Sequence, residues 1–261
     1  MVDRAGLLAD LAAEGDALDA VVAALPPEAW ATPTPADGWT IAVQIAHLTW
    51  TDEQALRALT DPDAFAADLR EADVAGLVDD AARTGAAAEP AEVLQRWRSR
   101  RAELAGRLAE SPDGLRVPWF GPPMSVSSMA TARLMETWAH GLDVTDALGS
   151  PPRWSARLRH VADLGVRTRD FAFRQHGRPV PAEPFRVDLG APDGSRWTWG
   201  PADAVQRVTG PALDFCLRVI RRRHRADLAL EAIGADAEQW LDLAQAFAGP
   251  PGAERASAGI A

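Results

Sequence analysis

Four long segments with the apolar periodicity of helices occupy most of the first 150 residues, and each ends at a proline, a glycine or a polar loop. The segments cover residues 5–24, 40–59, 90–110 and 127–148. Within them leucine, valine and tryptophan recur three or four positions apart, which places these side chains on one face of a helix. Thr40 is a candidate side-chain cap for the second segment, and Gly149 terminates the fourth. Four amphipathic helices joined by loops predict a helical bundle.

The pattern changes after Arg178. Residues 185–189 and 197–199 alternate apolar and polar side chains, and a turn sequence joins them, which predicts a β-hairpin. The other predicted elements are one or two short helices over 63–83, helices over 154–175, 209–223 and 236–247, and a strand over 228–233. The expected fold class is therefore α plus α+β. It comprises a four-helix bundle over residues 1–177, a small α+β domain over 178–250 and a disordered tail over 251–261.

Charge and composition disfavour several classes of protein. The formal net charge of −10 argues against a nucleic-acid partner. No stretch approaches the roughly 20 apolar residues of a membrane span, and the first residues lack the apolar run of a signal peptide, so we expect a cytoplasmic protein. The single cysteine, Cys216, stands among apolar neighbours and is expected to be a buried, inert thiol. The absence of lysine and tyrosine indicates GC-rich codon usage.

Three side chains form a candidate metal site. Glu136 and His140 stand four residues apart, on the same face of one predicted helix. His47 lies in another predicted helix, far upstream. If the bundle brings the two faces together, these residues make a two-histidine, one-carboxylate site that leaves a position open for water or substrate. The alternative is that the histidines are hydrogen-bonded core residues, and spacing alone does not decide between the two.

Two signatures resemble those of a known family. The run TPADGWT at Thr34–Thr40 leads into QIAHL at Gln44–Leu48, which contains His47. Far downstream lies Glu136-x-x-x-His140-x-x-Asp143. Together they resemble the mycothiol-dependent maleylpyruvate isomerase-like proteins, a branch of the DinB superfamily, and the C-terminal part is similar to the sterol-carrier-like α/β domain of that family.

The resemblance implies that His47, Glu136 and His140 are metal ligands, with zinc as the expected metal, although Ni²⁺ or Fe²⁺ would accept the same donors. Asp143 is a candidate acceptor for the free ring N–H of His140. Its alternative role is a helix-end or interdomain hydrogen bond.

The resemblance also implies a function. The open metal position would bind the thiol of mycothiol and keep it deprotonated for addition to a small electrophile. The outcome would be a cis–trans isomerisation of the maleylpyruvate type or an S-transfer. The alternative is a non-catalytic metal- or small-ligand-binding protein of the same architecture, since a fold alone does not confer a reaction. In either case the chain is expected to be a monomer or a homodimer.

Arg222 matches the position of a functional arginine of the family, as a candidate catalytic residue that binds a carboxylate. The alternative is a solvated arginine run, because Arg221 and Arg223 flank it at a predicted helix end. The candidate walls of the cleft are Trp39, Trp50 and Trp138, with the protein core as their alternative place. The remaining histidines, which have no partner pattern and are expected at the surface or at helix caps, are His160, His176 and His224.

Overall fold

The computed structural model describes residues 3–71 and 74–259. Its internal contacts divide the chain into two compact units, Met1–Pro152 and Arg153–Ala261. The sequence-based boundary followed the change from helical to alternating pattern after residue 177. In the structure, α7 (Leu158–Arg167) packs on α9 (Ala212–Val219), so it groups with the second unit. Within the described ranges no helix is both long and apolar enough to cross a membrane.

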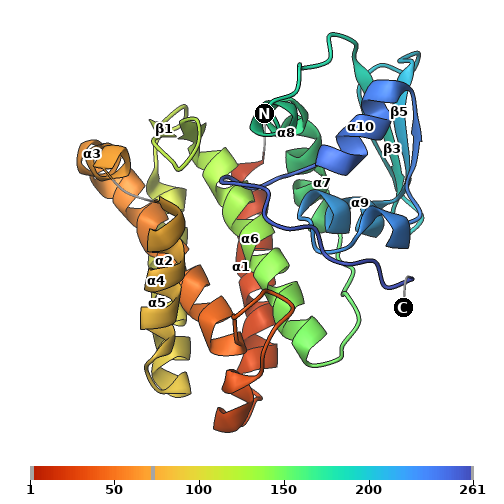
Figure 1. The fold of residues 1–261 in the computed structure, drawn as a ribbon. Helices are drawn as coiled ribbons and strands as arrows, with labels where there is room; N and C mark the ends of the chain where they lie inside the picture. Colours follow the sequence, from red (N-terminus) through yellow and green to blue (C-terminus); the bar gives the residue numbers. More distant parts are fainter. Residues whose placement is uncertain (1–2, 72–73, 260–261) are drawn as a thin grey trace. The chain divides into compact units, whose positions relative to one another are not determined.

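The first unit is built on the four predicted long helices (Figure 1). They are α1 (Arg4–Val22), α2 (Ile41–Thr60), α5 (Pro90–Glu110) and α6 (Val126–Ala147). The shorter elements of this unit are η1 (Pro27–Ala31), α3 (Pro62–Glu71), α4 (Val74–Ala86), β1 (Arg116–Val117) and β2 (Met124–Ser125). Helix α2 packs against α4, α5 and α6, and α1 packs against α5 and α6. Helix α2 is therefore the central member, and whatever it presents to α6 lies inside the bundle.

Apolar residues from these helices form one core. Its largest side chains are Trp30 and Trp97, and the inward faces of α1, α2 and α5 surround them. The predicted cap of α2 is confirmed: the Thr40 hydroxyl accepts a hydrogen bond from the Val43 amide at 3.4 Å. Ser125 caps α6 in the same way, with Oγ 3.1 Å from the Ser128 amide. The two helices that carry the candidate ligands thus begin at defined residues.

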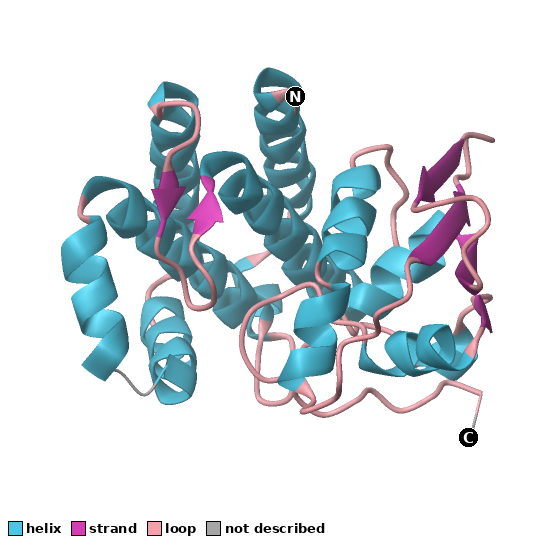
Figure 2. Ribbon diagram, turned by 90° about the horizontal axis from the view of Figure 1, so that it is seen from above, coloured by secondary structure: helices cyan, strands magenta, loops and turns pink. Residues whose placement is uncertain are grey.

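The second unit combines helices with a four-stranded sheet (Figure 2). Its elements besides α7 and α9 are α8 (Arg169–Gln175), β3 (Phe185–Gly190), β4 (Arg196–Trp199), β5 (Gln206–Pro211), η2 (Arg225–Asp227), β6 (Glu231–Ile233) and α10 (Ala235–Leu243). The strand order is β4-β3-β5-β6, with β3 and β5 parallel and the other pairs antiparallel. The predicted hairpin is confirmed, since Val187 pairs with Trp199 and Leu189 with Trp197. Helices α9 and α10 pack against β5.

Three predicted helices differ from the structure, and the last of them, expected over 236–247, is α10, which ends at Leu243. The segment expected as one helix over 154–175 is two helices, α7 and α8, which meet at Thr168. The Thr168 hydroxyl donates to the Leu164 carbonyl at 2.9 Å, so a side chain takes part in closing the last turn of α7.

The helix expected over 209–223 ends at Val219. Arg221 adopts a left-handed conformation with φ 57°, the position where helices usually carry glycine. The Arg222 amide then donates to the Leu217 carbonyl at 3.0 Å, which closes the helix end. Because no glycine stands at this position, the sequence did not indicate where the helix ends.

Candidate metal centre

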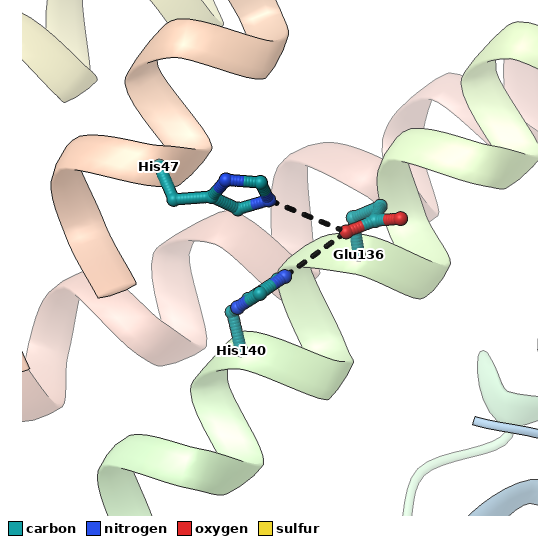
Figure 3. Close-up of side chains that lie close together, drawn as sticks. All are labelled: His47, Glu136 and His140. Atoms are coloured by element: carbon teal, nitrogen blue, oxygen red, sulfur yellow. Dashed lines mark hydrogen bonds and ion pairs between the residues drawn. The ribbon is translucent and has the colours of Figure 1, made fainter. Parts of the chain in front are cut away.

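The structure brings His47, Glu136 and His140 together between α2 and α6 (Figure 3). His47 projects from α2, and the other two project from consecutive turns of α6. His140 Nε2 lies 3.0 Å from Glu136 Oε2, and His47 Nε2 lies 3.8 Å from the same oxygen. One candidate ligand atom from each residue lies within 4.8 Å of the other two. This spacing is compatible with a shared ion at ordinary zinc–ligand distances of about 2 Å.

Burial sets the charges of this cluster. His47 and His140 are 7% and 8% exposed. Burial, reinforced by the nearby His140, lowers the pKa of His47 to about 4, so its imidazole is neutral at neutral pH. Burial alone would raise the pKa of Glu136, but its polar contacts with His140 and His47 hold it well below its ordinary value. The cluster therefore offers an ionised carboxylate beside a neutral imidazole, the protonation states that metal ligands need.

The two histidines are held in different ways. His140 Nδ1 lies 2.6 Å from Oε1 of Gln44, a fully buried side chain on α2. His47 Nδ1 is buried and has no hydrogen-bond partner among the residues that the structure describes. Its ring instead lies close to two aromatic rings, Trp39 and Trp50, at centroid distances of 5.1 and 6.2 Å. The Nε2 atoms of both histidines face Glu136, so the donor set fits a divalent cation.

Gln44 was not among the residues predicted from the sequence. It stands three residues before His47 on the same helix, a spacing that places the two side chains on neighbouring positions of one helix face. That spacing is the signal by which it could have been found. Asp143 is fully buried on α6, three residues after His140.

Aromatic rings line the cluster. Trp39 stacks on His140 at 5.9 Å and is half-buried. Its indole N–H donates to Asp79 Oδ1 at 3.2 Å, and the Arg83 guanidinium donates to the Gly38 carbonyl at 3.1 Å, so α4 holds the loop that carries this ring. Trp138, the third predicted wall residue, is buried in the core.

A buried ion pair ties α2 to α6 beside the cluster. Arg133 Nε lies 3.1 Å from Asp52 Oδ1, and Arg133 Nη2 donates to the Thr51 hydroxyl at 2.7 Å. Both charged side chains are buried, and Arg133 is one helical turn before Glu136. This pair fixes the two helices against each other close to the candidate ligands.

The other candidates lie in the second unit. Arg222 follows α9, is half-buried, and donates from Nη1 to the Ile220 carbonyl at 3.1 Å. His224 Nδ1 accepts from the Ala226 amide at 3.1 Å, which confirms a capping role. Cys216 is buried, and burial raises the pKa of its thiol, in agreement with an inert side chain.

Two protein-family models match different parts of the chain. A family model described as "Mycothiol maleylpyruvate isomerase N-terminal domain" matches residues 11–145. A model described as "Wyosine base formation" matches residues 181–232. The first match contains all three residues of the cluster.

Whole-chain relatives occur in Mycobacterium tuberculosis. "Uncharacterized protein Rv0036c" of strain H37Rv and "Uncharacterized protein MT0041" of strain CDC 1551 are each 57% identical over 257 residues, covering 98% of this chain and 100% of the relative.

Among solved structures, the mycothiol-dependent maleylpyruvate isomerase aligns with a TM-score of 0.58 at 15% identity, covering 83% of this chain and 88% of that one. A point mutant of that enzyme aligns with a TM-score of 0.59 at 14% identity and the same coverage. This likeness confirms the predicted combination of a helical N-terminal part with a C-terminal α/β part.

Proposed function

Because this chain belongs to the family of the mycothiol maleylpyruvate isomerase N-terminal domain, we propose that it is a metal-dependent enzyme that activates the thiol of mycothiol. The observation that carries the proposal is the convergence of His47, Glu136 and His140 inside the bundle. The proposed partners are a small-molecule thiol and a small electrophile, and the proposed location is the cytoplasm of an actinobacterial cell.

His47 Nε2, His140 Nε2 and a carboxylate oxygen of Glu136 would hold the metal, for which zinc is the first candidate. When bound, such an ion lowers the pKa of a coordinated thiol, so that the thiol is present as thiolate at neutral pH. The single carboxylate leaves the site with a net positive charge, which favours an anionic sulfur. Trp39 and Trp50 cover the imidazole rings with apolar surface and limit the access of water.

The thiol would add to a polarised double bond of the electrophile. In a maleylpyruvate-type isomerisation the new C–S bond permits rotation about the former double bond, and the thiol then leaves unchanged. In an S-transfer the C–S bond is retained. We propose that Asp143, buried on α6 three residues after His140, is a supporting residue of the metal centre, and that Arg222 binds a carboxylate of the electrophile.

Thiol-dependent turnover tests this function. Protein loaded with Zn²⁺ should accelerate the conversion of maleylpyruvate, or the S-alkylation of mycothiol by a simple electrophile, above the rate with metal-free protein. His140→Ala, incubated with the same concentration of Zn²⁺, should run at the background rate. If neither reaction is faster with the metal-loaded protein, the non-catalytic binding protein is the correct description.

Arg222 offers a second test of the same proposal. Arg222→Lys should be nearly as damaging as Arg222→Ala, because an ammonium group cannot reproduce the bidentate fork of a guanidinium. The loss of a charge-assisted hydrogen bond to a bound carboxylate costs about 1.5–3 kcal/mol, or one to two orders of magnitude in kcat/KM. Arg223→Ala is the matched control and should keep full activity. Arg221 is unsuitable as a control, because its guanidinium is partly buried and its left-handed backbone lies at the end of α9. If Arg222→Ala and Arg223→Ala behave alike in this assay, the arginine run is only a solvated helix end.

A further inference from the structure

We propose that Gln44 is a positioning residue that fixes the tautomer of His140 through a hydrogen-bond chain of defined direction, which starts at the Trp39 carbonyl. The chain runs from the Trp39 carbonyl to the Thr34 hydroxyl, then to the Gln44 amide, and ends at His140 Nδ1. Its effect is to keep a proton on Nδ1 and to turn the Nε2 lone pair toward Glu136 and His47. The tautomer follows from these hydrogen bonds alone, whereas its use in metal binding rests on the proposed function.

The direction of the chain follows from its first member. A carbonyl oxygen can only accept hydrogen bonds. The Trp39 carbonyl lies 2.9 Å from Thr34 Oγ1, so the single hydroxyl proton of Thr34 is used there. The Trp39 carbonyl also accepts a hydrogen bond from the Thr34 backbone amide at 2.8 Å, which holds the two residues of this loop in place. The lone pairs of Thr34 Oγ1 are then free to accept from the next member.

The next member is the side-chain amide of Gln44. It lies 2.8 Å from Thr34 Oγ1, and because that oxygen has no proton left to give, the group facing it must be the NH₂ of Gln44. The amide oxygen consequently faces His140 Nδ1 at 2.6 Å. The two ends of a glutamine amide are otherwise hard to distinguish, and here the network assigns them.

The last member is the imidazole of His140. Because Gln44 Oε1 can only accept, Nδ1 must carry a proton. In the neutral ring the lone pair is then on Nε2, which lies 3.0 Å from a Glu136 oxygen. Two acceptors at this distance repel each other, and a cation held between them would remove this repulsion. The hydrogen-bond chain thus favours a cation at the point where the three candidate ligands converge.

Burial makes this control effective. Gln44 is fully buried, and the loss of its oxygen would remove the acceptor that faces the Nδ1 proton in the structure. Within the described part of the chain His47 Nδ1 has no equivalent partner, so the orientation of the two histidines depends on different contacts. In known metal sites the removal of such a supporting acceptor weakens metal binding ten- to a hundredfold.

The direct test is the protonation state of His140 in the wild-type protein. Long-range ¹H–¹⁵N NMR of the metal-free and the Zn²⁺-loaded protein should show a protonated Nδ1 in both. This measurement needs no substitution and no activity. An unprotonated His140 Nδ1 in either sample would overturn the proposal, whatever the outcome of the turnover assays. A missing turnover with a protonated Nδ1 would reject the proposed function and leave this inference intact.

Substitutions test the role of Gln44 in metal affinity, measured by Zn²⁺ titration against a chelator. Gln44→Leu should weaken Zn²⁺ binding ten- to a hundredfold, and Gln44→Glu, which keeps an acceptor toward Nδ1, should restore it. Thr49→Ala is the matched control, because Thr49 is also buried on α2 but its hydroxyl donates to the Ile45 carbonyl. Asp143→Asn tests the competing acceptor. Unchanged affinity in Gln44→Leu, or loss of the Nδ1 proton in Asp143→Asn with Gln44 present, would contradict the assignment.

Discussion

His47→Ala is expected to abolish metal binding at the proposed centre while the first unit remains folded. The variant leaves only Glu136 and His140, which come from one helix, so the ion loses the only ligand that α2 provides. The loss should exceed the ten- to hundredfold effect of a supporting residue, because a direct ligand is removed. The fold should survive, because the apolar core around Trp30 and Trp97 keeps all its side chains in this variant.

Elemental analysis after exhaustive dialysis, with circular dichroism as the check on folding, measures this directly. His176→Ala is the control, since it removes a histidine of the second unit and should leave the metal content unchanged. Full metal occupancy in His47→Ala would refute the assignment of His47 as a ligand.

Asp52→Ala is expected to produce the largest loss of stability among single substitutions near the centre. It would leave the Arg133 guanidinium buried without its carboxylate, and the removal of one partner of a buried ion pair typically costs about 3–5 kcal/mol. Urea unfolding of the metal-free protein should show this as a lower midpoint with an unchanged slope.

The double variant Asp52→Leu/Arg133→Met tests whether the loss of stability comes from the unpaired buried charge. Because it removes both charges, it should be more stable than Asp52→Ala. Arg100→Ala is the exposed control: Arg100 pairs with Glu53, next to Asp52 in the chain, and both side chains are more than 40% exposed. It should change the free energy of unfolding by less than about 1 kcal/mol. An equally small change in Asp52→Ala would show that the buried pair does not hold α2 against α6.

The helices and the hairpin were predictable because their signals are local. The spacing of apolar residues located α1, α2, α5 and α6, and alternation located β3 and β4. The family resemblance rested on two short signatures, and the family match over residues 11–145 confirms it. That resemblance also suggested that residues as distant as His47 and His140 would meet, and the packing of α2 on α6 brings them together.

The remaining features depend on contacts that no local pattern reveals. The hydrogen-bond chain to His140 passes through Thr34, whose position depends on how the loop before α2 folds. The place of α7 in the second unit depends on its close approach to α9, where a Cβ added at Gly165 would lie 2.8 Å from Val219. The end of α9 depends on Arg221, which adopts a left-handed conformation that is uncommon for arginine.

The unequal division of the three candidate ligands between two helices has a mechanical consequence. Glu136 and His140 keep their mutual geometry for as long as α6 is helical, whereas His47 joins them only at one rotational setting of α2. A slip of α2 by a single residue would turn His47 by about 100° and carry it away from the other two. Metal affinity should therefore change strongly with the register between α2 and α6. Substitutions in the distant contact of α2 with α5 that shift this register should be detectable by metal titration before they are detectable as a loss of helix.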